Sequence, residues 1–125
     1  MNTGRQRRHR AWRFGRFAES LCAWHLRLRG YRVVARSFRS AVGEIDIVAR
    51  RGSVLAVVEV KGRGDLAAAA ESVGRRQRRR IARATEAFVK ARPGYAGLDL
   101  RFDVMLVRPW RLPRHLTGAW RADDR

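Results

Sequence analysis

Two carboxylates and one ammonium are spaced in this sequence so that they would project from one face of a β-hairpin. Asp46 lies in the segment 43–48 (Gly-Glu-Ile-Asp-Ile-Val), and Glu59 and Lys61 lie in the segment 57–61 (Val-Val-Glu-Val-Lys). Both segments alternate as strands do, so residues two apart share a face. Paired carboxylates suit a divalent cation, and a neighbouring ammonium suits a phosphate. The pattern therefore predicts a metal-dependent phosphodiester site.

The turn between the two strands decides how close these side chains come. A two-residue turn at residues 51–52 pairs Asp46 with Val57 and places Glu59 diagonal to Asp46, within reach of a shared ion. The opposite face is uniformly apolar and is expected to pack on the core: Ile45, Ile47, Ala49, Val54, Ala56, Val58 and Val60. A slip of one residue would bury charge and expose the valines, so the register is expected to be well fixed.

Magnesium is the cation that this arrangement suits, with manganese as its substitute. Asp46 and Glu59 supply hard oxygen ligands, the backbone carbonyl of Val60 adds another, and substrate phosphate and water complete the shell. Lys61 would orient or help to deprotonate the attacking water, or stabilise charge on phosphorus. Glu-x-Lys is common by itself, and the alternative is an exposed cross-strand ion pair contributing ~0–1 kcal/mol.

The rest of the chain predicts a single α/β domain around this hairpin. The expected elements are a helix over 13–29, strands over 31–39, 43–50 and 53–61, a helix over 73–91, and strands over 98–107 and 115–120. Ser72 is expected to cap the second helix, after a weakly determined connection over 62–72. Residues 1–12 predict a disordered basic tail, 13–120 the domain and 121–125 a second tail.

The first expected helix carries an apolar stripe that predicts its buried face. The stripe comprises Phe14, Phe17, Ala18, Leu21, Trp24, His25 and Leu28, at spacings typical of one helix face. A second face, with Gly15, Cys22 and Leu26, could also approach the hairpin. Gly30 follows the stripe, as glycine often does at a helix end.

Composition points to a polyanionic partner. The 125 residues carry a formal net charge of +18, and clustered cations release counterions on meeting phosphates. An anionic membrane surface is the competing interpretation, but no apolar run approaches the ~20 residues of a spanning helix. The basic start lacks the apolar stretch of a signal peptide, so a cytoplasmic protein is expected. The single cysteine, Cys22, excludes an internal disulfide and a multi-cysteine zinc site.

Arginines near the expected site are candidates for phosphate contact. Arginine accounts for 27 of the 29 basic residues, and the two lysines are Lys61 and Lys90, so a lysine retained at position 61 has modest weight as a sign of chemistry that arginine cannot perform. The candidates for nucleic-acid binding are Arg36, Arg63, Arg75, Arg76, Gln77, Arg79 and Arg80. The alternative is an ordinary solvated helix face. Trp12, Trp110 and Trp120 could stack on unpaired bases, whereas Trp24 is assigned to the core.

The chain resembles the YraN-type bacterial proteins, which are endonuclease-like. The shared motifs are Gly15-x-x-Ala18-Glu19, Gly30-Tyr31, Gly43-Glu44-Ile45-Asp46, Val58-Glu59-Val60-Lys61-x-Arg63, Gln77-Arg78-Arg79-x-Ile81 and Arg101-Phe102-Asp103-Val104. The resemblance spans about Gly15 to Trp120. It implies a restriction-endonuclease-like fold, similar to Holliday-junction resolvases, with a mixed sheet flanked by helices. It also implies that Glu19 joins the metal site, although Arg76 stands where the family usually has lysine.

Three functional hypotheses follow. The first is a Mg²⁺-dependent nuclease acting on DNA, including branched or damaged DNA, in which Asp46, Glu59, Lys61 and Glu19 form the site. The second is a non-catalytic module of the same fold that binds DNA, RNA or the ribosome. The third is a structural protein whose tails recruit another chain. Cutting two strands symmetrically, as a resolvase does, would require a twofold homodimer.

Overall fold

The computed structural model describes residues 3–122, and side chains from residue 15 onward. The chain forms helix α1 (Thr3–Leu28), strands β1 (Arg32–Ser40), β2 (Gly43–Arg51) and β3 (Val54–Lys61), helices α2 (Leu66–Glu71) and α3 (Arg75–Ala91), a 3₁₀ turn (Pro93–Tyr95), and strands β4 (Asp99–Leu106) and β5 (Arg114–Trp120). The five strands form one mixed sheet in the order β1-β2-β3-β4-β5. The predicted α/β fold, a mixed sheet flanked by helices, is confirmed.

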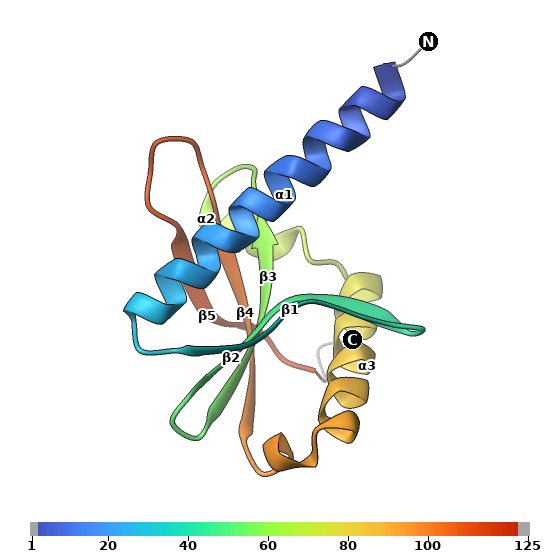
Figure 1. The fold of residues 1–125 in the computed structure, drawn as a ribbon, viewed down its shortest axis with the longest axis vertical. Helices are drawn as coiled ribbons and strands as arrows, with labels where there is room; N and C mark the ends of the chain where they lie inside the picture. Colours follow the sequence, from blue (N-terminus) through green and yellow to red (C-terminus); the bar gives the residue numbers. More distant parts are fainter. Residues whose placement is uncertain (1–2, 123–125) are drawn as a thin grey trace.

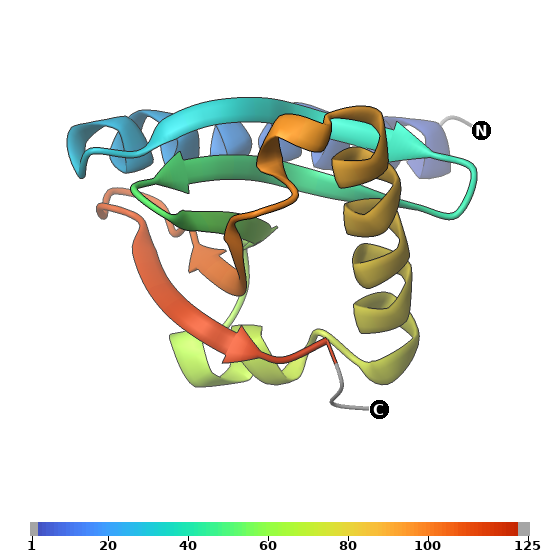
Figure 2. The same cartoon turned by 90° about the horizontal axis from the view of Figure 1, so that it is seen from below.

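Helices cover both faces of the twisted sheet. Helix α1 lies across one face, and α2 and α3 lie on the other (Figures 1 and 2). Strands β1 to β3 form an antiparallel meander. The crossover through α2 and α3 then returns the chain so that β4 runs parallel to β3, and β5 closes the sheet antiparallel to β4. The carboxyl end of β3 therefore lies beside the carboxyl end of β4.

Helix α1 differs from expectation in both extent and buried face. It begins at Thr3 rather than residue 13, so residues 3–12, expected to be disordered, are helical; residues 1–2 lie outside the described part. It ends as predicted at Gly30, whose φ is +86°, and Tyr31 N–H donates to the Leu26 carbonyl at 3.0 Å, as in a Schellman motif. Within the described residues, no helix is both long enough and apolar enough to cross a bilayer.

The buried face of α1 contains only part of the expected apolar stripe, namely Ala18 and His25, and it includes Cys22 and Leu26 of the second face. Ala18, Cys22, Ala23 and Leu26 are buried against the sheet. Phe17, Trp24 and Leu28 are instead 64%, 48% and 66% exposed, so their assignment to the core was wrong. Small side chains let the helix axis approach the sheet closely, and the larger apolar side chains are left on the outer side.

The hairpin register differs from the predicted one by two residues. Arg51 pairs with Val54 and Val48 with Val57, so the turn is Gly52-Ser53 rather than Arg51-Gly52. Gly52 has a φ of +60°, which a tight hairpin turn requires at its first position. An even shift preserves which residues share a face, so Asp46 and Glu59 remain on one side. The shift brings Asp46 level with Glu59 instead of diagonal to it.

Both faces of the hairpin belong to a core. Ile47, Ala49, Ala56 and Val58 pack with α1 as predicted, while Val48, Leu55 and Val57 pack with α2 and α3. Ile45 is the exception, because it packs in the core with α2 and α3, whereas Ile47 packs in the core with α1.

The crossover contains two helices where one was expected. Asp65 caps α2, its side chain accepting a hydrogen bond from Ala68 N–H at 2.8 Å. Ser72 ends α2 instead of capping the following helix, whose N-cap is Gly74. The predicted role of Ser72 was therefore wrong. The early turn at residues 72–74 starts α3 at Arg75 and sets which of its side chains face the hairpin.

Gly43 marks the closest approach between the hairpin and α3. A Cβ atom built at Gly43 would lie 2.2 Å from the Arg80 carbonyl oxygen, a distance that backbone cannot tolerate without moving. We expect Gly43→Ala to lower the free energy of unfolding by about 1–3 kcal/mol, because α3 must shift. The measurement is denaturant unfolding. Gly97→Ala is the matched control, since a Cβ atom added there would meet nothing within 4 Å; equal losses in both variants would contradict the close-approach argument.

Candidate functional site

Strands β2 and β3 separate at the position of Asp46, and this gap is the centre of the candidate site. Their paired ladder ends at Ile47–Val58. Beyond it, the Asp46 Oδ2 atom takes the place of a backbone partner and accepts a hydrogen bond from Val60 N–H at 2.8 Å. The C=O of a strand residue points to the same edge as its N–H, so the Val60 carbonyl faces the gap, where it was predicted to act as a ligand.

Asp46 and Glu59 form a close carboxyl pair. Both carboxyl groups are largely buried, and the negative charge of Asp46 acts on Glu59. Burial, followed by the negative charge of Asp46, raises the pKa of Glu59 to about 8. Burial also raises the pKa of Asp46, despite the hydrogen bond from Val60 N–H. The pair therefore holds a proton near neutral pH that a divalent cation could replace.

Gln77 of α3 joins Glu59 to Lys61. Its Nε2 donates to Glu59 Oε1 at 2.7 Å, and its Oε1 accepts from Lys61 Nζ at 3.4 Å. The direct separation between Lys61 Nζ and Glu59 Oε1 is 3.7 Å. Both charged side chains are largely buried, at 23% and 13% exposed. This arrangement excludes the alternative of an exposed cross-strand ion pair on a solvated sheet face.

The raised pKa of Glu59 gives a stability prediction with an unusual sign. Its folded-state pKa, about 8, lies above the ordinary value of 4.5. The contribution of Glu59 to the free energy of unfolding is therefore greatest below pH 4.5 and is lost as the pH rises through 8. Glu59→Gln keeps the acceptor for Gln77 without the charge. We expect it to raise the Tm of the metal-free protein at pH 8 by at least about 4 °C and to flatten the pH dependence.

The control for this thermal measurement is Glu86→Gln, a change at an exposed α3 carboxylate outside the site. Its Tm is expected to match that of the original protein at every pH. A lower Tm for Glu59→Gln at pH 8 would show that Glu59 stabilises the fold as an ordinary ion pair.

Glu19 reaches the same region from α1. It is buried, and its carboxylate is held by Arg36 Nε at 3.2 Å and by Ser37 Oγ at 2.9 and 3.0 Å. Glu19, Ser37, Asp46 and Val60 line one cavity of about 580 Å³. Glu19 therefore lies on the buried face of the helix rather than on a solvated one.

The Cys22 thiol lies close enough to Asp46 and Glu19 for their charges to affect its pKa. Burial, followed by the negative charges of Asp46 and Glu19, raises the pKa of the Cys22 thiol to about 12. The thiol is buried and free. It is a structural group beside the site rather than a nucleophile.

A second cavity lies on the α3 side of the gap. It measures about 440 Å³, and its lining includes Asp46, Glu59, Gln77, Arg76 and Arg80. Asp46 lines both this cavity and the one containing Glu19. Asp46 therefore borders both cavities, and the α3 cavity connects the carboxyl pair with arginines.

The structure divides the predicted phosphate-binding residues into three groups. Arg75, Arg76, Arg79 and Arg80 are exposed on the first turns of α3, and two of them line the acidic cavity. Arg63 is exposed on the loop after β3. Arg36 instead holds Glu19 and Ser20, and Gln77 is occupied by Glu59 and Lys61. These two therefore position site residues in the present arrangement.

Ser37 belongs to the site although sequence reasoning did not select it. It binds both Glu19 oxygens and has a φ of +49°, a conformation that is unusual for a residue with a side chain. Backbone strain of this kind concentrates at functional positions. A serine within an alternating strand carries no sequence signal for it.

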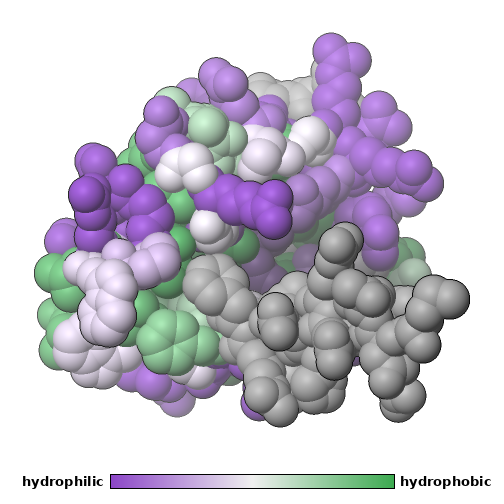
Figure 3. All heavy atoms as spheres, turned by 90° about the horizontal axis from the view of Figure 1, so that it is seen from above, coloured by the Kyte–Doolittle hydropathy of each residue, from purple (hydrophilic) through white to green (hydrophobic). Residues whose placement is uncertain are grey.

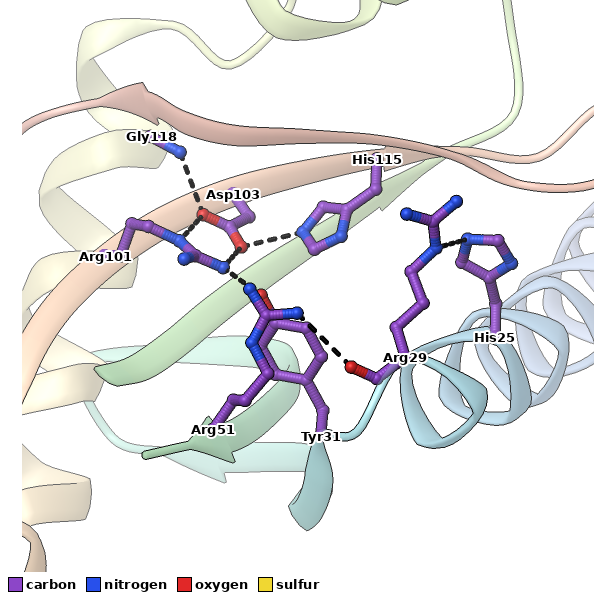
Figure 4. A network of polar contacts seen from close by, with 8 residues as sticks. All are labelled: His25, Arg29, Tyr31, Arg51, Arg101, Asp103, His115 and Gly118. Atoms are coloured by element: carbon purple, nitrogen blue, oxygen red, sulfur yellow. Dashed lines mark hydrogen bonds and ion pairs between the residues drawn. The ribbon is translucent and has the colours of Figure 1, made fainter. Parts of the chain in front are cut away.

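The motif Arg101-Phe102-Asp103-Val104 forms a separate polar network (Figure 4). The fully buried Asp103 carboxylate receives hydrogen bonds from Arg101 at 2.9 Å, from Gly118 N–H at 3.0 Å and from His115 Nε2 at 2.8 Å. Arg101 also donates to the Tyr31 hydroxyl. The network ties β4 to β5 and to the chain following α1, so the motif is structural.

The fit of a metal to these residues rests on the donor set. Among residues 15–122, no three His, Cys, Asp or Glu side chains converge as a metal cluster. Two carboxylates and an inward-facing carbonyl nevertheless match Mg²⁺, which keeps several waters and takes one or two protein carboxylates together with substrate phosphate. The donor set suits Mg²⁺ or Mn²⁺ and lacks the nitrogen and sulfur ligands of zinc sites.

Comparison with known proteins places the chain in a family. Residues 18–107 match the model of "Uncharacterised protein family UPF0102". A "UPF0102 protein" of Parvibaculum lavamentivorans is 56% identical over 89% of this chain and 84% of its own. One of Paramagnetospirillum magneticum is 50% identical, covering 90% and 91%, and one of Rhizorhabdus wittichii is 49% identical, covering 91% and 96%.

These matches confirm the resemblance to YraN-type proteins that the motifs indicated. The matched residues include the candidate site from Glu19 through Gln77. The chain belongs to the UPF0102 family.

Proposed function

We propose that this protein is a Mg²⁺-dependent nuclease that hydrolyses phosphodiester bonds of DNA. The observation that carries the proposal is the Asp46–Glu59 carboxyl pair, which lines one cavity together with Arg76 and Arg80 of α3 and in which burial and the charge of Asp46 raise the pKa of Glu59. Two acidic groups buried side by side destabilise the fold unless a cation joins them. Such strain is typical of functional sites.

Each residue has a defined role in this proposal. Asp46, Glu59 and the Val60 carbonyl would hold Mg²⁺ or Mn²⁺, which, when bound, lowers the pKa of a bound water and neutralises charge on the phosphate. Lys61 lies next to Glu59 and would hold the attacking water or the phosphate oxygen. Gln77 fixes both side chains. Glu19 would supply a further carboxylate from the α1 side, aligned by Arg36 and Ser37.

The exposed arginines of α3 would bind the phosphate backbone beside the site. Arg76 and Arg80 line the acidic cavity, and Arg75 and Arg79 lie on the same two turns of the helix. Gly43 holds this helix against the hairpin, so the phosphate contacts and the carboxyl pair keep a fixed spacing. We extend the proposal to a cytoplasmic protein without membrane contact, and to a homodimer where two strands are cut.

The test is cleavage of labelled DNA by the purified chain. Branched, duplex and single-stranded substrates are incubated with Mg²⁺, Mn²⁺ or EDTA. The proposal expects products with either cation and none with EDTA. Products that are insensitive to EDTA, or unchanged by substitution of Asp46, would assign the activity to something else.

A non-catalytic nucleic-acid or ribosome-binding module is the second candidate. One observation favours it: among the described side chains, no cluster of three ligands is preformed. It predicts salt-sensitive binding without cleavage and without a change in Tm when Mg²⁺ is added. A bound metal that raises the Tm would favour the nuclease, because a ligand that binds only the folded state stabilises it.

A further inference from the structure

The loop between β4 and β5 presents an unpartnered aromatic side chain beside the candidate site. Trp110 is 102% exposed and has a φ of +62°. A left-handed conformation is unfavourable for a bulky residue, so this loop holds its largest apolar side chain outward at a cost to its backbone. The other described non-glycine residue with positive φ is Ser37, in the candidate site.

Trp110 belongs to a wider groove that we call the Trp110 surface. It measures about 380 Å³ and includes Phe17, Leu21, Val107, Trp110 and Leu112. Phe17 is 64% exposed and Leu112 is 69% exposed. Figure 3 shows green apolar and pale side chains gathered on the left of the molecule, next to purple hydrophilic ones. The lining of the groove itself combines the rings of Phe17 and Trp110 with Arg108 and Arg111.

The Trp110 surface is continuous with the candidate site in two ways. Val107 N–H donates to the Lys61 carbonyl at 2.8 Å, so the loop starts beside the strand end that carries Lys61. On α1, Phe17 and Leu21 line the groove while Glu19 lines the acidic cavity. A chain leaving the acidic cavity would reach Trp110 by crossing the carboxyl ends of β3 and β4.

The charges around the groove indicate which class of molecule would bind there. Arg108 lines the groove and Arg111 is exposed at its edge, flanking Trp110 within a chain of net charge +18. Arginines and an open aromatic face together match unpaired nucleotides, whose bases stack on rings while their phosphates pair with cations. A duplex keeps its base faces stacked inside. A second copy of this chain would bring like charges together.

We propose that the Trp110 surface binds the unpaired strand of a nucleic-acid substrate whose phosphodiester lies at the Asp46–Glu59 pair. This inference rests on the proposed function for its substrate, and it narrows that substrate to DNA containing a single-stranded segment. Trp110 is a stacking residue here, Arg108 and Arg111 hold the adjoining phosphates, and none of the three takes part in the reaction.

The test measures binding without cleavage. Fluorescence anisotropy in EDTA compares a labelled single-stranded oligonucleotide with a blunt duplex carrying the same number of phosphates. Trp110→Ala is expected to weaken single-strand affinity about 5- to 150-fold, from the loss of one stacked base, with duplex affinity unchanged within about twofold. Trp110→Phe should restore most of the loss. Trp24→Ala, on α1 outside the groove, should leave both affinities unchanged.

Because EDTA removes any cleavage, this result is independent of nuclease activity. An Asp46→Asn protein that binds both oligonucleotides normally but does not cut would show that DNA binding at the Trp110 surface and cleavage at the Asp46–Glu59 pair are separate properties. Absent single-strand binding, or equal losses on single strand and duplex in Trp110→Ala, would overturn the inference.

Two further arms identify other occupants. Co-sedimentation with vesicles containing phosphatidylserine tests an anionic membrane, and sedimentation equilibrium tests a second copy of the chain. Vesicle binding or a dimer that is lost in Trp110→Ala, with single-strand affinity unchanged, would assign the surface to that occupant instead and overturn the inference.

Discussion

Replacing Asp46 with asparagine is expected to lower Mg²⁺-dependent DNA cleavage at least about 100-fold, since even residues behind metal ligands commonly contribute 10- to 100-fold. Asparagine keeps an oxygen that can accept the hydrogen bond from Val60 N–H, so the fold is expected to survive. It cannot supply the negative charge that a hard cation needs. The measurement is the initial cleavage rate at saturating DNA, accompanied by anisotropy to show that DNA affinity changes little.

Matched controls distinguish an effect of the site on the cleavage rate from a general effect of changing the net charge. Lys61→Ala should also abolish cleavage, whereas Lys90→Ala, which removes the other lysine of the chain, should not. Glu86→Gln changes the net charge by as much as Asp46→Asn, outside the site. A cleavage rate that Asp46→Asn leaves within a few-fold of the original, with Lys61→Ala equally active, would remove the hairpin from the reaction.

Asp103→Asn is expected to produce the largest loss of stability. The Asp103 carboxylate is fully buried and neutralises Arg101 while bonding to His115 and the Gly118 N–H. Removing one partner of a buried ion pair destabilises by about 3–5 kcal/mol, which corresponds to a Tm lower by about 10 °C or more. Thermal unfolding followed by circular dichroism measures the change.

The same group gives a dependence on acid pH. Burial by itself raises the pKa of Asp103, but the hydrogen bonds from His115, Arg101 and Gly118 outweigh it and hold the pKa below its ordinary value of 3.8. The stabilisation is therefore present above pH 3.8 and is lost as the pH falls through the lower folded-state pKa. Asp103→Asn should lose that part of the acid dependence.

Arg39→Gln is the control for both measurements, because the Arg39–Glu44 pair is exposed, at 3.7 Å. Such a pair contributes at most about 1 kcal/mol. A Tm for Asp103→Asn equal to that of Arg39→Gln would show that the network in Figure 4 does not hold the sheet together.

Alternation within the hairpin was enough to predict which residues share the site. Asp46 and Glu59 share a face in any register shifted by an even number, so the two-residue error did not separate them. The error arose from the turn, where positive φ belongs at the first turn position, and Gly52 therefore had to come first rather than second. The local sequence therefore predicts which side chains share a face of the hairpin more firmly than it predicts which residues pair across it.

The buried face of α1 could not be read from hydrophobicity. The predicted stripe included Phe17, Trp24 and Leu28, which are exposed, whereas Cys22 and Leu26 of the second face are fully buried. The choice depends on how near the helix axis comes to the sheet, which is a property of the assembled layers. Glu19 was accordingly expected at the site from family resemblance rather than from periodicity, and the structure places it in the cavity with Asp46.

Contacts between distant segments were beyond sequence reasoning. Gln77 lies between Lys61 and Glu59 because α3 starts at Arg75 and packs against Gly43, whereas the expected Ser72 cap placed the start of this helix at residue 73. Trp120 was a candidate for base stacking, but it is buried and stacked on Phe102 with ring centroids 4.1 Å apart. Trp12 lies among the residues whose side chains are not described.

The sheet topology also orders the assembly of the molecule in time. Asp46 and Val60 are 14 residues apart within one hairpin, whereas Arg101 and Tyr31 are 70 residues apart and meet only once β4 has docked. Short loops close with a smaller entropy loss than long ones, so we expect the acidic hairpin to form while its surroundings are still open to water. Repulsion between the carboxylates would then be felt only late, when the helices exclude solvent and the distant Asp103 network joins the final strands.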